Sequence, residues 1–363
     1  MSLRTSPGQC AVTEVVLERG VRAIRLENDL VAATVLPDKG ADVYTLTWKP
    51  RGLDVLWKSP WGLHRPGGGV PTASGSLAAW LGAYEGGWQE IFPSGGGPSY
   101  YKGVELNYHG EASVVTWDYD IVIPGGDAAE LRLWTRLARS PFLIERTMRV
   151  EMASPILTLS GRITNVGGES LDYMWGHHPA YGAPFLSAAC RIDTNARSLR
   201  ADDEFDGPFN PLAPDARAAW PSVLRDGQTT NLSSVPGENT HRHLLAYLHD
   251  FVGDHGWYAL TNSELGLGIG LVWPTSVFPY AWFWQELHAS PGFPWYQGVY
   301  VMAIEPFTSI PGQGLGQVME KTGSHRTLHP GETVEAELRA VFYESRIGVQ
   351  EIAAEGTVVL KEE

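Results

Sequence analysis

The feature that most constrains the fold is an alternation of apolar and polar residues with a period of two, which recurs along most of the chain. In "FLIERTMRVEM" the apolar residues Phe142, Ile144 and Met148 share one parity, and "VEAELRAVF" follows the same pattern. This spacing is typical of strands that bury one face. The stretch "EASVVTWDYDIVIPGGDAAELRLWTRL", residues 111–137, predicts two strands joined by a Pro-Gly-Gly-Asp turn.

Helical periodicity is scarce, and the best candidate is a short helix within Gly75–Tyr84. The 41 glycines and 25 prolines among 363 residues favour turns over long helices. We therefore predict an all-β fold, a large antiparallel β-sandwich with long loops and few short helices, built as a single domain over residues 1–363. Residues 59–101 and 202–239 read as long loops over one face, and loops of this length are often functional.

Charge and motif content exclude several classes of function. A formal net charge of −14 argues against a nucleic-acid partner and against an anionic membrane surface. We see no signal peptide and no apolar run long enough to span a bilayer, so we expect a cytoplasmic protein, a monomer or a homodimer. The chain has two cysteines and no nucleotide-binding glycine motif. We expect no cofactor and no metal site, since the histidines at 241, 243, 249 and 255 lack zinc-ligand spacing.

Two candidate proton-transfer groups precede prolines. In "YMWGHHPAYG", His177 and His178 lie among aromatic residues, and Pro179 holds His178 in an extended conformation. Histidine is the side chain whose ordinary pKa lies nearest to neutral pH. Glu305 ends the apolar run "VYVMAI" and so lies at or near the end of a strand, where catalytic groups are common. A packed histidine and an ordinary edge carboxylate are the alternatives.

Two aromatic segments are candidate walls of a sugar site, because the C–H faces of sugars stack on aromatic rings. "AYEGGWQEIFPSGGG" places Trp88, Gln89 and Glu90 directly after two glycines. If this segment is extended, Gln89 and Glu90 point in opposite directions, so one faces a pocket and the other a structural partner. "VWPTSVFPYAWFWQELHAS" is rich in aromatic residues and carries Gln285. A core role for Trp88 and a buried strand around Gln285 are the alternatives.

The order of these segments resembles that of the aldose 1-epimerase (galactose mutarotase-like) family. The similar segments are "LENDLVAATVLPDKGADVYTLTWKPRGLDVLW", "GRITNVGGESLDYMWGHHPAYG" and "MAIEPFTSIPG". In that family a large antiparallel β-sandwich carries a histidine as general acid and a glutamate as general base, which act on a free sugar. The resemblance implies Glu305 as the base and His178 as the acid. His177 is the alternate acid, and otherwise a hydroxyl-binding neighbour.

The resemblance also implies a monosaccharide substrate and no cofactor. As the residues that bind the sugar we predict His177, Trp88, Gln89, Glu90, Gln285 and Tyr181. The chain departs from the galactose enzymes in two places. Gly-His-His-Pro replaces their Asn-His-Ser/Thr-aromatic motif, and "YEGGWQEIFPSGG" replaces their Leu-His-Gly-Gly loop. The chain therefore resembles a divergent branch, for which galactose is not implied as the substrate. An acidic group on the sugar has Lys102, Arg65 and Arg146 as candidate partners.

We therefore predict an isomerase of the aldose 1-epimerase type, which interconverts the anomers of a free or modified monosaccharide. A non-catalytic carbohydrate-binding or sensor protein on the same fold is the alternative. A lyase or glycoside hydrolase, in which Glu90 and Glu305 flank a glycosidic bond, ranks third because the histidine would lack a role.

Overall fold

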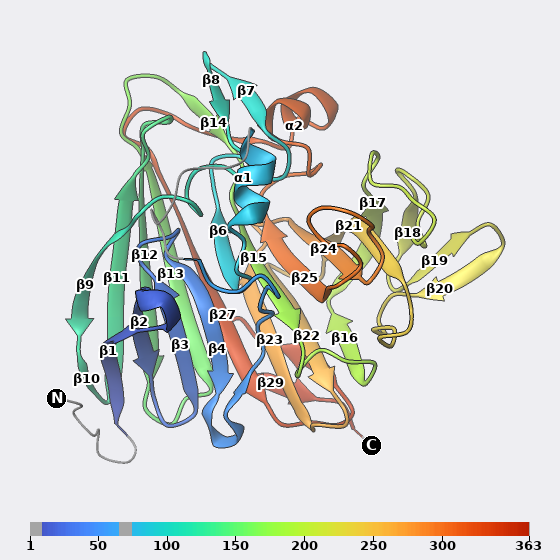
Figure 1. Cartoon of the computed structure of the whole chain (residues 1–363), viewed down its shortest axis with the longest axis horizontal. Helices are drawn as coiled ribbons and strands as arrows, with labels where there is room; N and C mark the ends of the chain where they lie inside the picture. The colour runs from blue at the N-terminus through green and yellow to red at the C-terminus, as the bar shows by residue number, and fades with distance from the viewer. Residues whose placement is uncertain (1–8, 65–74, 363) are drawn as a thin grey trace.

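The computed structural model describes residues 9–64 and 75–362. Two large antiparallel sheets dominate these residues (Figure 1), so the all-β sandwich predicted from the sequence is confirmed. The helix expected within Gly75–Tyr84 is present as α1 (Ser76–Gly82). The other helical elements of the described residues are α2 (Leu315–Lys321) and the 3-10 turns η1 (Glu18–Gly20) and η2 (Lys49–Arg51). No helix in the described ranges is long and apolar enough to cross a membrane.

The larger sheet has thirteen strands, and it brings together segments from the whole length of the chain. Its three central strands, β6, β15 and β25, are far apart in sequence and adjacent in space. In spatial order the strands are β10 (Gly125–Gly126), β1 (Cys10–Val16), β2 (Arg22–Glu27), β3 (Val31–Leu36), β4 (Asp42–Trp48), β6 (Trp88–Ile91), β15 (Gly176–Gly182), β25 (Tyr300–Phe307), β24 (Tyr280–Leu287), β21 (Arg242–Phe251), β17 (Ala196–Ala201) and β18 (Arg217–Ala219), with β5 (Leu53–Asp54) beside β4.

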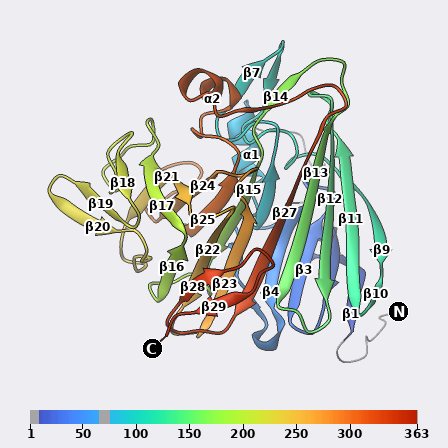
Figure 2. The same cartoon turned by 180° about the vertical axis from the view of Figure 1, so that it is seen from behind.

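The second sheet has eight strands and covers one face of the first, as the view from behind shows (Figure 2). Its spatial order is β16 (Cys190–Thr194), β22 (His255–Asn262), β23 (Leu267–Pro274), β27 (Thr333–Tyr343), β13 (Ile156–Asn165), β12 (Phe142–Glu151), β11 (Ala128–Arg136) and β9 (Asp118–Ile123). Four two-stranded ribbons complete the fold: β14 (Leu171–Tyr173) with β26 (Arg326–Leu328), β19 (Ser222–Arg225) with β20 (Gln228–Asn231), β28 (Val349–Ile352) with β29 (Val358–Leu360), and β7 (Ser99–Tyr101) with β8 (Val104–Leu106).

The main hydrophobic core lies between the two sheets and is built by the predicted alternation. Ile144 and Met148 of β12 and Leu159 of β13 face Trp88 and other side chains of the larger sheet. Burial of each such side chain contributes about 1.5–3 kcal/mol to stability. The prediction for residues 111–137 is confirmed, because β9 and β11 pair antiparallel on either side of the turn.

The two stretches predicted as loops contain more regular structure than expected. Residues 59–101 include α1, β6 and β7, and residues 65–74 within them lie outside the described residues. Residues 202–239 include β18 and the hairpin β19–β20. This hairpin turns at Asp226 and Gly227, both in the left-handed region, and it pairs only with itself. Because the two four-residue strands pair only with each other, they show no alternating apolar pattern by which the sequence could predict them.

The central strands are buried on both faces. All residues of β6, β15 and β25 are buried, because a second layer of side chains covers the sheet on the side away from the second sheet. There Trp80 and Tyr84 of the α1 region pack over β15 and β25, and Leu315 and Val318 of α2 pack near them. We call this side of the larger sheet the outer face, and the side toward the second sheet the inner face.

Candidate active site

A cavity of about 570 Å³ lies on the outer face, over the central strands. Its walls are mostly aromatic, and its floor carries an imidazole and a carboxylate from two adjacent strands, His178 of β15 and Glu305 of β25. The aromatic residues of the wall are Trp80, Tyr84, Tyr108, Phe205, Trp282, Trp284 and Trp295. A concave, largely apolar site with a few polar groups that point to one place is typical of small-molecule binding.

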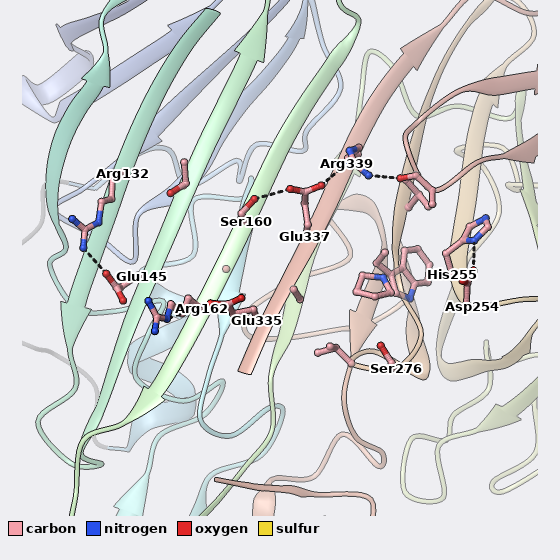
Figure 3. Close-up of a pocket in the computed structure, with 18 residues that line it drawn as sticks. Arg132, Glu145, Ser160, Arg162, Asp254, His255, Ser276, Glu335, Glu337 and Arg339 are labelled. Carbon is pink, nitrogen blue, oxygen red and sulfur yellow. Dashed lines mark hydrogen bonds and ion pairs between the residues drawn. The ribbon is translucent and has the colours of Figure 1, made fainter. Parts of the chain in front are cut away.

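A larger hollow, of about 830 Å³, lies on the second sheet and has a different character (Figure 3). It spans an open sheet surface, and its charged side chains neutralise one another in pairs. We therefore place the candidate chemistry in the cavity on the outer face, where acid and base are buried without other partners. The ion pairs of the larger hollow are Arg132–Glu145, Arg162–Glu335 and Arg339–Glu337.

His178 and Glu305 face each other across neighbouring strands. The register pairs Gly176 with Phe307 and Ala180 with Ala303, which sets His178 opposite Glu305. Nε2 of His178 lies 3.7 Å from Oε1 of Glu305. His178 and Glu305 are far apart in the sequence, so their contact depends on the fold and not on their spacing. Both side chains line the cavity, as the prediction of a shared site requires.

Burial controls the protonation of this pair. Removal from water raises the pKa of the Glu305 carboxyl well above its ordinary value. The same effect lowers the pKa of the His178 imidazole to about 4. Burial therefore favours the form of the pair in which a single proton lies on Glu305. Within the described residues, Oε2 of Glu305 and Nδ1 of His178 are buried without a hydrogen-bond partner. Buried polar atoms without a partner are uncommon in proteins and often belong to functional groups.

His109 is a third polar group of the cavity, and the sequence analysis missed it. Its Nδ1 accepts a hydrogen bond from the Gly96 N–H over 3.1 Å, and burial lowers the pKa of its imidazole well below the ordinary value. The ring is therefore neutral, with its proton on Nε2. This leaves an N–H donor in the lining of the cavity, with the two ring centroids of His109 and His178 5.6 Å apart. Nothing in "ELNYHGEA" distinguishes this histidine from a surface one.

Tyr84 adds a hydroxyl to the same lining. Its OH is buried and has no hydrogen-bond partner among the described residues, and its ring meets that of His178 edge-on at 5.8 Å. Trp80 and Tyr84 are four residues apart at the end of the predicted helix, and their rings stack at 4.6 Å. The sequence could have predicted this contact, because two residues four apart lie on one face of a helix.

Strand alternation separates the two adjacent histidines. His178 faces the cavity, and His177 therefore points to the inner face, where it packs against Trp175 and Phe278. Burial, followed by the nearby Arg146 charge, lowers the pKa of His177 to about 3. Both ring nitrogens of His177 are buried without a partner in the described part of the chain. The structure does not bring His177 to the cavity.

Four more of the predicted substrate-binding residues also point to the inner face. Glu90 accepts a hydrogen bond from Trp175 Nε1 over 2.9 Å and pairs with Arg146 at 3.3 Å. It therefore lies on the opposite side of the sheet from Glu305, and the two carboxylates cannot flank one glycosidic bond. The other three are Trp88 in the main core, Tyr181 hydrogen-bonded to Tyr258 across the sandwich, and Gln285 against Met302.

Gln89 is on the outer face but is not among the residues that line the cavity. It pairs with His178 in the β6–β15 register. Gly86 and Gly87 both have positive φ, and a side chain at Gly86 would collide with the Trp57 carbonyl oxygen. These glycines bring the chain into β6, and the Gly86 carbonyl accepts a hydrogen bond from Gln89. Gln89 and Glu90 point in opposite directions, as expected of an extended segment, but neither of them lines the cavity.

The cations suggested as partners for an acidic sugar do not line the cavity either. Arg146 is buried on the inner face, and Lys102 pairs with Glu169 on the surface. Arg65 lies outside the described residues. Within residues 9–64 and 75–362, no group of three or more His, Cys, Asp or Glu side chains has an arrangement that could hold a metal ion.

Several solved structures share this fold at low sequence identity. A protein provisionally named aldose 1-epimerase from Klebsiella pneumoniae matches with a TM-score of 0.66 and 16% identity, over 92% of this chain and 84% of that one. The Slr1438 protein of Synechocystis matches with a TM-score of 0.62 and 14% identity, over 89% and 96%. A galactose mutarotase-like protein of Clostridium acetobutylicum gives 0.61 and 14%, over 93% and 99%. The chain thus has the aldose 1-epimerase, or galactose mutarotase-like, fold.

The family follows from the sequence itself. Residues 18–341 match the family described as a domain of unknown function, DUF4432, and the chain belongs to this family. No curated protein sequence matches it.

Proposed function

We propose that this protein is an isomerase of the aldose 1-epimerase type, which interconverts the anomers of a reducing sugar. The observation that carries the proposal is the His178–Glu305 pair, 3.7 Å apart on the floor of an aromatic cavity. The resemblance seen in the sequence and the shared fold support it. The cavity supplies the two things that the reaction needs, a binding surface for the C–H faces of a sugar ring and a coupled acid and base.

Mutarotation opens a sugar ring and closes it again on the other face of C1. The hydroxyl on C1 loses a proton while the ring oxygen gains one, and both oxygens are bonded to the same carbon. Acid and base must therefore reach the substrate from adjacent positions, as two side chains on neighbouring strands do. Each positioned proton transfer typically accelerates a reaction by about 10²–10⁴-fold.

One shared proton is sufficient for this exchange. When His178 holds it, the imidazolium donates to the ring oxygen and the Glu305 carboxylate accepts the hydroxyl proton, which are the roles that the sequence resemblance implies. When Glu305 holds it, as burial favours in the resting pair, the two roles are exchanged. The two placements of the proton, on His178 or on Glu305, contain the same number of protons and therefore give the same dependence of the rate on pH. In either case His109 Nε2–H and the Tyr84 hydroxyl are free to bind sugar hydroxyls.

The test is anomer exchange of free aldoses, measured by NMR on the purified protein and two variants. Glu305→Gln keeps the size of its side chain, and His178→Asn replaces the imidazole by a smaller neutral amide. Each removes the proton chemistry of its residue, so we expect each to lower the exchange rate by at least about 10²-fold. Glu335→Gln and His329→Asn make the same chemical changes at exposed sites away from the cavity and should leave the rate unchanged.

Exchange that is equally fast in the parent and in Glu305→Gln contradicts the proposal. Sugar binding detected by calorimetry without any anomer exchange identifies a carbohydrate-binding or sensor protein instead.

A further inference from the structure

A series of aromatic rings leads away from the catalytic pair toward solvent. The Trp284 ring lies 5.8 Å from that of His178, and the Trp295 ring lies 5.6 Å from that of Trp284. Trp284 and Trp295 both line the cavity and are only partly buried. Trp57 packs edge-on behind Trp295 at 6.3 Å and supports it from the protein side. The series therefore presents partly accessible aromatic surface at about the spacing of contacting rings.

The aromatic surface continues outside the cavity. Tyr296 follows Trp295 directly, is 61% exposed, and meets Trp61 edge-on at 6.2 Å. Trp61 is itself 45% exposed. Two neighbouring large aromatic side chains that stay in water beside a binding cavity are a typical mark of an interaction site.

The segment that carries these rings is held in an unusual backbone conformation. Tyr296 and Gln297, neither of them glycine, have φ values of 46° and 57°. Tyr296 N–H donates to the Gly292 carbonyl over 2.7 Å, and Gln297 N–H donates to the Ser290 carbonyl over 2.9 Å. Left-handed backbone at such residues is costly and is concentrated at ligand sites. The loop between β24 and β25 is thus fixed with Trp295 against the cavity and Tyr296 in solvent.

The size and charge of the cavity narrow the ligand class. A volume of about 570 Å³ lies within the roughly 300–1,000 Å³ of sites that enclose drug-sized molecules, which are larger than one hexose. Among the described lining residues there is no lysine or arginine, whereas Glu204, Glu286 and Glu305 are carboxylates. The Nζ of Lys321 donates to Glu204 and Gln313 of the lining and to Asp203, so its charge is already paired. The described lining therefore matches an uncharged ligand longer than a monosaccharide.

We propose that the site takes a neutral reducing oligosaccharide. Its reducing-end sugar occupies the position over His178 and Glu305, the second sugar stacks on Trp295, and a third reaches Tyr296 and Trp61. This inference rests on the proposed epimerase function for the orientation of the chain, because only the reducing end has an anomer to exchange. The aromatic series alone defines where the second and third sugars lie.

The experiment compares sugars of increasing length. Anomer exchange is measured by NMR for glucose, for maltose, cellobiose and lactose, for maltotriose and cellotriose, and for glucose 6-phosphate. We expect at least one disaccharide to have a kcat/KM about ten-fold above that of glucose, the equivalent of one aromatic stacking contact. Glucose 6-phosphate should be the poorest substrate. Equal kcat/KM for glucose and every disaccharide, or a preference for the phosphate, overturns the inference.

Two variants assign the subsites. Trp295→Ala should lower kcat/KM for the preferred disaccharide about ten-fold more than it lowers that for glucose. Tyr296→Ala should lower kcat/KM for the trisaccharide and leave kcat/KM for the disaccharide unchanged. Trp134→Ala, a partly buried tryptophan of β11 that contacts Arg132, is the matched control and should change neither value.

The two proposals fail in different ways. If glucose and the disaccharides are exchanged equally well, the oligosaccharide inference is wrong and the epimerase function stands. If no sugar is exchanged but a disaccharide binds more tightly than glucose in calorimetry, and Trp295→Ala removes the difference, the epimerase function is wrong and the extended site stands.

Discussion

The side-chain amide of Gln89 donates to the Asp42 carboxylate over 3.2 Å and to the Gly86 carbonyl over 2.7 Å. Both amide protons are thereby used, so Oε1 is left as an acceptor. This oxygen is buried and has no partner in the described residues, and Gln89 is the cross-strand neighbour of His178. Cross-strand neighbours have Cβ atoms about 4.5–5.5 Å apart. Nδ1 of His178 also has no partner among the described residues, so the two atoms form no hydrogen bond in the resting structure. We infer that Gln89 is a positioning residue whose oxygen becomes an acceptor for the imidazole when His178 is protonated.

Replacement of Gln89 tests this role. In Gln89→Leu the imidazolium form of His178 loses an acceptor, so we expect kcat to fall about ten-fold with little change in KM, and the acidic limb of the pH–rate profile to move to lower pH. NMR anomer exchange as a function of pH gives these values. Ile91→Val, two residues further on the same face of β6, tests whether any loosening of the strand has the same effect. An unchanged pH profile in Gln89→Leu means that the residue is only structural.

The pH dependence of the parent protein follows from the shared proton. Below the His178 pKa of about 4 both partners hold protons and no base is left. Above the raised pKa of Glu305 both have lost them and no acid is left. We therefore expect a bell-shaped kcat profile with its acidic limb near pH 4 and a broad plateau through neutral pH. An acidic limb near the ordinary histidine pKa would show that the imidazole is not desolvated in the working enzyme.

Removal of the buried acid should stabilise the protein at alkaline pH. The pKa of Glu305 is raised by burial, so its carboxyl is neutral when folded and ionised when unfolded between the two pKa values. Stability is therefore full below the ordinary pKa of a glutamate and declines as the pH rises toward the folded pKa. Glu305→Gln cannot ionise and escapes this loss.

We expect Glu305→Gln to unfold at higher urea concentration than the parent at about pH 8, with a gain above about 1.4 kcal/mol, the value of a single pKa unit. At about pH 4 the two proteins should be equally stable. A constant difference at all pH values would instead point to a change in packing.

The buried Arg146–Glu90 pair should show strong coupling. Both side chains are almost fully buried on the inner face, and the Arg146 guanidinium also lies over the Trp117 ring at 5.2 Å. Arg146→Met leaves a carboxylate without its partner and should cost about 3–5 kcal/mol in urea unfolding. The double variant Arg146→Met/Glu90→Gln keeps an acceptor for Trp175 and should recover most of that loss. If the free-energy loss of the double variant equals the sum of the losses of the two single variants, the pair is not coupled.

Sequence reasoning predicted the sandwich because most strands bury only one face. The period-two pattern is plain in β12 and β27, where buried and partly exposed residues alternate. His178 and Glu305 could also be found, because each precedes a proline in an otherwise apolar, aromatic context. Their partnership follows from the order of segments in a known family and not from any local signal.

The wall of the site could not be predicted in the same way. In β6, β15 and β25 every residue is buried, so the hydrophobic pattern does not show which parity faces the cavity. This is why the sequence predicts substrate ligands among residues that lie on the inner face, namely Trp88, Glu90, His177, Tyr181 and Gln285. The groups that do line the cavity, such as His109 and Trp295, come from irregular segments whose course depends on long-range contacts.

The acid and the base belong to paired strands in the middle of the larger sheet, and their separation is set by backbone hydrogen bonds. The aromatic wall, by contrast, comes largely from α1, from the segment around His109 and from the loop between β24 and β25. Substitutions in these segments can therefore change which ligand the cavity accepts, while the distance between His178 and Glu305 stays constant.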